Sequence, residues 1–543
     1  MADAVTGFDI SEQNGPGHAI ARVTTGITAF VGRALKGPVD TPVVIHSFAE
    51  YVRLFGGLWQ PSTLSYALEQ YFDNGGRKAI VVRVANGARP PTITLPTGGA
   101  PLTLVALAPG SREYLRASVD LDGVGANEED RFNLVVQRLR TPGSERVEDQ
   151  EIFRRLSVQP GSDRHVATVL LDSRLVRVSG EVPRARPLRT PARTSSLLAG
   201  YVASNPDGDD GAPLTDYDII GSSQRGTGLF SLRMAPRFDL LCVPPLTRSD
   251  DVGLSTLMIA ARVCREHQAM LIVDPPAAWS NAGAAIEALR LWPFRSEQAL
   301  MYYPRVLAFD RVRGRHEVFA SCGAAAGLIA RGDATTPVWS AGEGDEPVLR
   351  PALRTAVQID DAERARLAQL GVNTFATVRP VRRSCSPRTL GAGGSGPADW
   401  TWLGARRLAL FILASVEEGT RWIVFQHDRP DAWARLRAQV EAFLAALDDD
   451  GAFVGRDAAE RWFVICDERL NPPTSTAAGR VHLLLGFAPL RAGDFHAFLV
   501  TQRAGGSSVR PVSVNRLATS RARVGEEIET AILRGIALEA QAF

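Results

Sequence analysis

The last third of the chain has the most complete pattern of apolar and polar positions. Apolar residues recur at nearly helical spacing over residues 402–418, and Gly419 follows as a helix stop. Residues 421–425 (RWIVF) predict a short buried strand, and residues 431–447 predict an amphipathic helix with Asp431 as its N-cap. Three more strands are predicted at residues 462–466, 481–487 and 495–501. This α-β-α-β-β-β block is a framework of helices and strands without a catalytic motif.

The preceding part of the chain predicts further alternating elements. Strands are expected at residues 27–32, 42–47 and 78–84, and helices at residues 48–54 and 64–72. Short alternating runs between residues 102 and 178 predict a small, largely β domain. Farther on, strands at 240–243, 271–273 and 305–309 alternate with helices at 255–266, 284–291 and 322–331, as β-α-β units do. The pattern predicts a multidomain protein of mixed α+β and α/β class.

Composition narrows the possible functions. The 543 residues include 61 Lys and Arg against 59 Asp and Glu, a balance that does not suggest a general nucleic-acid or anionic-membrane binder. The five cysteines are far apart and never form C-x-x-C, so we expect reduced thiols rather than a disulfide framework or a zinc site. The first 17 residues lack a basic and an apolar region typical of a signal peptide. No apolar run approaches the roughly 20 residues that span a bilayer.

Candidate catalytic and metal-binding residues are few. Ser321, in the segment FASCGAAAG, is the nearest candidate for a nucleophile, but no histidine lies in a matching glycine-rich context. His482 and His496 lie in predicted strands and could share a face, yet two histidines without a third ligand make a weak metal site. The acidic run 448–450 fits a solvated helix end better than a calcium loop. We therefore expect no enzyme activity, no cofactor and no metal.

Several blocks of the sequence resemble contractile phage tail sheath proteins. The C-terminal blocks are GTRWIVFQHDRPDAWARLRAQVEAFLAALDDDGAF and FVICDERLNPPTSTAAGRVHLLLGFAPLRAGDFHAFLVTQ. An N-terminal block, TGITAFVGRALKGPVDTPVVIHSFAEYVRLFGG, and the shorter segments EIFRRLSV, LIVDPP and YYPRVLAFD follow the family's order. The resemblance covers roughly residues 17–502, which is nearly the whole chain.

The resemblance implies a domain organisation. An N-terminal arm (1–22) precedes the first half (23–88) of a discontinuous sheath core domain, whose second half is residues 375–503. Between them are expected a small β-rich domain (89–198) and a subtilisin-like, non-catalytic α/β domain (199–374). Residues 504–543 are a C-terminal extension, in which Ile528, Ile532, Ile536 and Leu538 have loose helical spacing behind three glutamates.

The resemblance also implies partners and site residues. Extended arms would pair between subunits of a helical homopolymer, and Phe495, Ala497, Leu499 and Thr501 are the candidate residues for that strand pairing. Arg435 and Arg437 are candidates for contact with an inner tail tube protein. Other expected partners are baseplate and terminator or cap proteins and sheath paralogues. Neither nucleic acid nor direct membrane insertion is expected.

The function that follows is a structural one. The subunit would polymerise around an inner tube and contract to drive that tube through a target cell envelope. Assembly would take place in the bacterial cytoplasm, and the product would be a virion tail or a released phage-tail-like particle. Two alternatives remain: a static helical tube or shell protein, and a hydrolase built on the α/β domain.

Overall fold

The computed structural model describes residues 19–143, 146–191, 200–340, 348–350, 352–375, 387–392, 398–426 and 429–512. The chain folds into two compact units, each treated separately below. The α/β unit comprises Gly26–Thr335 and Gly344–Ser384. The carboxy-terminal unit comprises Met1–Thr25, Thr336–Glu343 and Cys385–Phe543.

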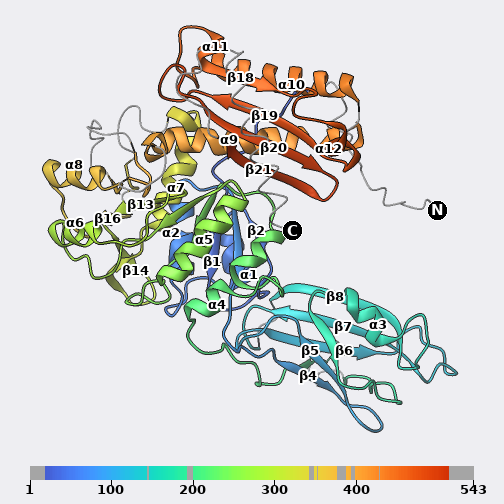
Figure 1. The fold of residues 1–543 in the computed structure, drawn as a ribbon. Helices are drawn as coiled ribbons and strands as arrows, with labels where there is room; N and C mark the ends of the chain where they lie inside the picture. The colour runs from blue at the N-terminus through green and yellow to red at the C-terminus, as the bar shows by residue number, and fades with distance from the viewer. Residues whose placement is uncertain are drawn as a thin grey trace. The chain divides into compact units, whose positions relative to one another are not determined.

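A seven-stranded sheet forms the centre of the α/β unit (Figure 1). Its strands, in spatial order, are β17 (Asn373–Thr374), β13 (Ala299–Tyr303), β12 (Met270–Val273), β11 (Leu240–Cys242), β1 (Thr28–Gly32), β3 (Ala79–Arg83) and β2 (Val43–Ile45). All neighbours are parallel except β2 and β3. Every residue of β1, β3, β12 and β13 is buried, as expected for parallel strands covered on both faces.

Helices cover this sheet, and two glycines set the closest helix contact. The helices are α1 (Phe48–Phe55), α2 (Thr63–Asp73), α4 (Asp216–Ile220), α5 (Leu254–Glu266), α6 (Ala282–Arg290), α7 (Cys322–Asp333) and α8 (Asp361–Gln369), with the 3-10 helix η2 at Gly228–Met234. The chains of α2 and α7 approach so closely that a Cβ on Gly323 would lie 2.0 Å from the carbonyl oxygen of Ala67. A Cβ on Gly327 would lie 2.5 Å from the carbonyl oxygen of Tyr71. Only glycine fits at these two positions.

The same unit contains three smaller sheets. Two pack into the predicted small β region around a shared apolar core that includes Leu104, Leu134 and Val136. Their strands are β4 (Thr92–Leu95), β5 (Leu102–Ala106) and β9 (Val176–Ser179), and β10 (Val202–Ala203), β6 (Tyr114–Asp120), β7 (Arg131–Leu139) and β8 (Val147–Ser157), with short helices α3 (Val166–Val169) and η1 (Leu170–Asp172). The third consists of β15 (Arg315–Phe319), β14 (Val306–Asp310) and β16 (Arg354–Thr355).

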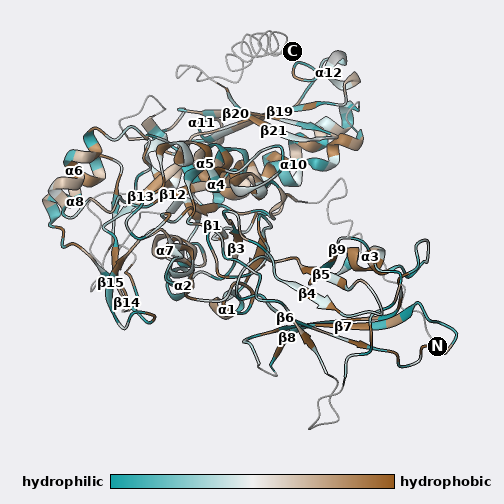
Figure 2. Cartoon of the chain, turned by 90° about the horizontal axis from the view of Figure 1, so that it is seen from below, coloured by the Kyte–Doolittle hydropathy of each residue, from teal (hydrophilic) through white to brown (hydrophobic). Residues whose placement is uncertain are grey.

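The carboxy-terminal unit packs two long helices against an antiparallel sheet. The helices are α9 (Leu403–Gly419) and α10 (Pro430–Asp449), and the sheet order is β18 (Trp462–Ile465), β19 (Val481–Phe487), β20 (His496–Arg503) and β21 (Gly506–Val512). Short helices α11 (Ala458–Arg461), α12 (Pro473–Ala477), η3 (Val338–Ser340), η4 (Ala398–Thr401) and η5 (Arg421–Gln426) connect these elements. The main core joins both helices to alternate strand residues such as Leu483, Leu485 and Val500. Figure 2 shows the mixture of hydrophobic and hydrophilic residues along these elements.

Most predicted elements are present, but five predictions about the fold are wrong. Residues 421–425 form η5 and not a buried strand, with Trp422 and Ile423 buried and Phe425 exposed. Asp431 is not the N-cap of α10, because Arg429 holds that position and Pro430 begins the helix. A strand of a β-α-β unit was expected at residues 305–309. The strand found there, β14, belongs to an antiparallel hairpin, and the parallel strand is β13, which precedes it in the chain.

The fourth correction concerns domain organisation. The sequence analysis joined residues 23–88 to residues 375–503 in one core domain. In the structure, β1, β2 and β3 lie in the same sheet as β11, β12 and β13, and this sheet belongs to the α/β unit. Residues 385–503 belong to the other unit. Pairing of β1 with β11 spans more than two hundred residues, so local patterns do not reveal it.

The fifth correction concerns the two histidines. His482 pairs with Thr501, whereas His496 pairs with Phe487. His482 and Phe487 are five positions apart on β19, and side chains alternate along a strand, so the two histidines point to opposite faces. They cannot bind one metal ion together.

Candidate assembly surfaces and a buried polar cluster

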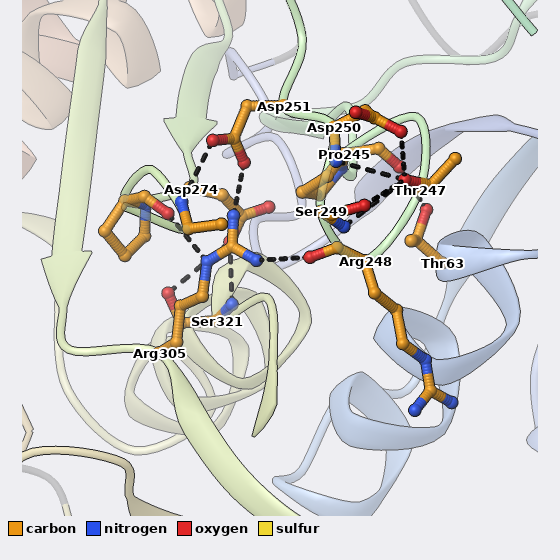
Figure 3. Close-up of polar contacts among 12 residues, drawn as sticks. Thr63, Pro245, Thr247, Arg248, Ser249, Asp250, Asp251, Asp274, Arg305 and Ser321 are labelled. Carbon is orange, nitrogen blue, oxygen red and sulfur yellow. Dashed lines mark hydrogen bonds and ion pairs between the residues drawn. The ribbon is translucent and has the colours of Figure 1, made fainter. Parts of the chain in front are cut away.

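A polar cluster lies where β12 and β13 end, beside the start of α7 (Figure 3). Asp274 Oδ1 accepts hydrogen bonds from the backbone N–H groups of Ser321 and Cys322, both at 2.7 Å. A carboxylate at a helix N-terminus satisfies free donors and interacts favourably with the helix dipole. Burial raises the pKa of Asp274, and these hydrogen bonds and the Arg305 charge oppose that shift. The carboxylate therefore acts as a cap on α7.

Arg305 closes the same cluster from the other side. Its Nε donates to the carbonyl oxygen of Pro275 at 2.9 Å, and Nη1 donates to that of Arg248 at 3.2 Å. Its Nη2 forms an ion pair with Asp251. Arg305 is only 7% exposed, so its charge is placed in a buried site with its donors satisfied by neighbouring loops. The arginine thus ties the loops that follow three neighbouring strands.

Ser321 shares this cluster but lacks the partners of a catalytic serine. Its Oγ donates to the carbonyl oxygen of Tyr302 at 3.0 Å and lies 3.4 Å from Asp274 Oδ1. The residue is 1% exposed. No hydrogen bond joins Ser321 to a histidine in the described part of the chain. These described partners of Ser321 differ from those of the serine in a Ser-His-Asp triad.

A small cavity lies near the position where ligands bind in many open α/β sheets. Ligands bind outside the carboxyl ends of the strands where the strand order reverses, which in this sheet lies between β11 and β1. Near this position, Thr63 Oγ1 donates to the carbonyl oxygen of Pro245, and Thr247 bonds to Asp250. The cavity lined by Thr63, Pro245 and Arg248 holds about 10 Å³, enough for a single water molecule.

In the carboxy-terminal unit, the strand predicted to pair between subunits is an interior strand. β20 is bonded to β19 on one side and to β21 on the other. Ala497 pairs with Gly486 and Val512, Leu499 with Leu484 and Arg510, and Thr501 with His482 and Ser508. Phe495 precedes the strand and packs edge-on against Phe463, with ring centroids 5.2 Å apart. Addition of a strand directly to β20 would require β21 to leave.

The edges of this sheet are β18 and β21. β21 was not predicted as a strand and lies in the residues assigned to the C-terminal extension. Exposed and half-buried residues alternate along it, and it contains Pro511. Proline is compatible with an edge strand, where one row of backbone groups has no neighbour. Among the described residues, no strand pairs with the outer side of β21.

The end of the N-terminal arm lies along the two long helices. Arg22 forms an ion pair with Asp450 at 2.5 Å, and the backbone N–H of Val23 donates to Ser415 Oγ at 3.2 Å. Ile20 is buried beside Gly419, where an added Cβ would lie 3.0 Å from the isoleucine side chain. Residues 19–23 are therefore part of the carboxy-terminal unit, and residues 1–18 lie outside the described residues.

The candidate arginines lie on the solvent side of α10. Arg435 donates to Gln426 Oε1 at 2.9 Å and lies 3.3 Å from Asp431, while Arg437 lies 3.9 Å from Glu441. These exposed contacts contribute little to stability. Next to Gln426, Phe425 is 89% exposed. Phe425 was not among the predicted site residues, because residues 421–425 were expected to form a buried strand.

Other site chemistry is sparse in the described residues. His496 Nε2 lies 3.0 Å from Asp399 Oδ2, and His482 Nδ1 lies 2.9 Å from Thr501 Oγ1. No group of three or more His, Cys, Asp or Glu side chains in the described ranges is arranged to hold a metal ion. Among the described helices, none is long and apolar enough to cross a membrane.

Comparison with known proteins identifies the fold. No family model matches the sequence, and no curated protein matches it. The structure is similar to the sheath tail protein Lin1278 from Listeria innocua, with 13% identity over 89% of this chain and 96% of that chain and a TM-score of 0.58. It is also similar to the PVC sheath complex of an extracellular contractile injection system in the contracted state (14% identity, 91% of this chain, 96% of that chain, TM-score 0.50). A chain of the anti-feeding prophage baseplate in the contracted state gives 16% identity over 91% of this chain and 95% of that chain, with a TM-score of 0.50. The chain therefore has the fold of tail sheath proteins and of contractile injection system sheaths.

Proposed function

We propose that this protein is the sheath subunit of a contractile tail or phage-tail-like particle. The observation that carries the proposal is the similarity to Lin1278, which extends over 89% of this chain and 96% of that chain. The hydroxyl of Ser321 donates to the carbonyl oxygen of Tyr302 and has no described hydrogen bond to a histidine, which is consistent with a structural role for the α/β unit.

In this proposal, subunits polymerise into a tube around an inner tail tube and hold a metastable extended state. A baseplate signal releases the subunits into a shorter and wider lattice, and a terminator or cap protein ends the polymer. The work comes from more favourable contacts between subunits in the contracted lattice. Two packings of the same folded subunit are the bistable element, so no nucleotide hydrolysis is needed.

Subunits in such a polymer need a contact that survives the change of lattice. The four-stranded sheet of the carboxy-terminal unit offers one, because backbone groups on the outer sides of β18 and β21 have no strand partner among the described residues. An arm from a neighbour that adds a strand there gains affinity from backbone hydrogen bonds. Phe495, Ala497, Leu499 and Thr501 would then lie in the interior of a shared sheet.

The inner tube is proposed to meet α10. Arg435 and Arg437 carry exposed positive charge, and Phe425 adds an exposed aromatic ring beside Gln426, the hydrogen-bond partner of Arg435. Aromatic and arginine side chains are enriched in protein interfaces. Each contact is weak, but many copies along a tube act together.

The proposal is tested by deleting residues 1–17. Their sequence lacks a periodic apolar core pattern, so we expect the variant to fold with an unchanged melting temperature. Loss of the arm should abolish polymerisation, which negative-stain microscopy of the purified variant would show as the absence of tubes. Normal contractile particles built from this deletion would contradict the role of the arm.

A further inference from the structure

Helix α5 has exposed apolar side chains on its outer side in the part of the chain that the structure describes. The side of α5 that faces the sheet is formed by residues such as Leu257, Ala260 and Cys264. On the outer side, Leu254 and Met258 are one helical turn apart and are 43% and 60% exposed. Two adjacent exposed apolar residues on one helix are a small surface, but they are not alone.

Helix α4 brings a third large side chain to this surface. Asp216 Oδ1 accepts a hydrogen bond from the backbone N–H of Gly253 at 2.7 Å and a second from Thr256 Oγ1. These bonds fix the start of α4 against the first turn of α5. Tyr217, the next residue, is 86% exposed. Tyr217, Leu254 and Met258 form what we call the α5 patch.

The second half of α5 has a different character. Arg262 and Arg265 are exposed there, and Arg262 Nε lies 3.0 Å from Glu266 Oε1. The outer side of α5 therefore runs from apolar residues at its N-terminal end to arginines at its C-terminal end. A helix that packs antiparallel to α5 would complement this side if acidic residues came first and apolar residues followed.

The chain itself contains a segment with that order. Residues 524–540 lie outside the described residues, and their sequence places Glu526, Glu527 and Glu529 before Ile532, Ile536 and Leu538. In an antiparallel helical alignment, Glu529 and Glu526, one turn before it, would lie towards Arg262 and Arg265, and Ile532 and Ile536 would meet Met258 and Leu254. Such a short amphipathic segment gains helical stability mainly from packing against another surface.

We propose that residues 524–540 of a neighbouring copy dock on the α5 patch. The proposal rests on the sheath function proposed above, because polymerisation places the tail of one subunit beside the surfaces of others at high effective concentration. Charge complementarity and the matched order of apolar residues select the tail over an unrelated partner. Docking would clip neighbouring subunits together through a contact separate from the sheet edges.

A cross-linking experiment on mixed chains tests the proposal. One chain carries Met258→Cys and the other carries Ile532→Cys, so a disulfide between the new cysteines can form only between different molecules. The matched control replaces Met258→Cys by Asp361→Cys on α8, whose parent side chain is 96% exposed. We expect a covalent dimer in the first mixture at least tenfold above the control mixture and above either chain alone. Equal yields in the two mixtures would overturn the proposal.

Charge reversal sharpens the test. Arg262→Glu with Arg265→Glu should lower the cross-link yield several-fold, and adding Glu526→Arg with Glu529→Arg in the partner chain should restore it. Failure of the second pair to restore the yield would contradict the antiparallel alignment. A chain with both cysteines that closes on itself as a dilute monomer would show docking within one molecule and would overturn the proposal.

The cross-link also separates this inference from the proposed function. If the parent chain forms contractile sheaths but the first mixture gives no specific dimer, only the docking proposal fails. If the parent forms no polymer, the sheath function fails, and the yield in solution still decides whether the tail binds the α5 patch.

Discussion

The two main sheets of this protein differ in how far their strands are buried and in the length of their edge strands. In the α/β unit, every residue of six strands is buried (β1, β3, β11, β12, β13 and β17), and Asp274 and Arg305 form hydrogen bonds with backbone groups near the strand ends. In the carboxy-terminal unit, helices α9 and α10 contribute to one core with the sheet, while the edges β18 and β21 have no strand partner among the described residues. Both sheets have edge strands, but β17 and β2 of the parallel sheet have only two and three residues, whereas β18 and β21 have four and seven and leave more backbone groups for another chain.

In the sheath that we propose, this difference would give the two units different roles. A sheet whose strands are buried and whose end loops are held by Arg305 behaves as a rigid body, because packed interiors deform little. An antiparallel sheet with open edges can accept strands from neighbours and still keep its core. In a sheath that changes its lattice, rigid bodies linked by strand contacts allow subunits to move without unfolding.

The largest expected effect comes from removing the edge strand β21 of the carboxy-terminal sheet. Truncation after Ala504 deletes β21, which pairs with β20 over seven residue pairs from Ala497–Val512 to Arg503–Gly506. Because each backbone hydrogen bond contributes roughly 1 kcal/mol net, the loss should be on the order of several kcal/mol. Truncation after Val512 keeps β21 and is the matched control. Urea denaturation that gives equal stability for the two truncations would show that β21 is not part of the folded sheet.

The next prediction concerns the close contact between helices α2 and α7 in the α/β unit. Gly323→Ala places a methyl group 2.0 Å from the carbonyl oxygen of Ala67, so α2 and α7 must move apart. Overpacking of this kind costs about 3 kcal/mol. Gly332→Ala on the same helix meets no atom within 4 Å and should be neutral or stabilising by up to about 1 kcal/mol. Thermal denaturation of the two variants measures the difference, and equal melting temperatures would contradict the close helix contact.

The relation between sequence and structure differs between these two sheets. Strand β19 has the predicted bounds, because it is a short apolar run between the turn residues Gly479 and Pro489. The order of the parallel sheet could not be read in this way, since its strands are uniformly apolar and pair across long separations. The strand predicted at residues 421–425 was wrong for a related reason. A short apolar run fits a buried strand and a buried turn of helix equally well.

The candidate site was only partly predictable. The sequence around Ser321 offers no histidine in a matching context, whereas the role of Asp274 as a cap of α7 depends on strand order and could not be predicted. Arg435 and Arg437 remain predictions that come from the family resemblance and from their place on an amphipathic helix. The exposure of Phe425 could not be predicted, because it depends on residues 421–426 forming η5 instead of a buried strand.

A smaller effect is expected at the buried polar cluster. Asp274→Ala removes the acceptor for two backbone N–H groups of α7 and should cost about 2 kcal/mol of unfolding free energy. Asp274→Asn retains an acceptor oxygen and should cost less. Urea denaturation of both variants near neutral pH tests the cap, and a loss no larger for alanine than for asparagine would contradict it.

The same residue gives a pH dependence with a defined sign. Burial raises the pKa of Asp274 above its ordinary value of 3.8, so the folded protein binds this proton more tightly than the unfolded chain does. The resulting stabilisation is fully present below 3.8 and is lost as the pH rises through the raised value. The stability of the wild type relative to Asp274→Asn should therefore fall with increasing pH. A difference that stays constant or increases with pH would show that the pKa is not raised.

The smallest effect on folding is expected on α10. Arg435→Glu with Arg437→Glu breaks two exposed contacts along the helix, each worth no more than about 0.5 kcal/mol. The melting temperature should hardly change, whereas assembly around the inner tube should weaken if these arginines contact acidic groups. Arg456→Glu, which breaks the exposed contact with Glu460, is the control. Unchanged assembly and triggered contraction in the double variant would remove the tube contact from this surface.

The central claim is that the chain forms a sheath with two packings of one folded subunit. Electron microscopy of purified particles, before and after triggering with mild acid or denaturant, tests it most directly. We expect tubes of a single protein in two forms, one long and narrow and one short and wide, with the same subunit fold in both. Tubes of one fixed length and diameter under all conditions would contradict the claim and identify a static shell.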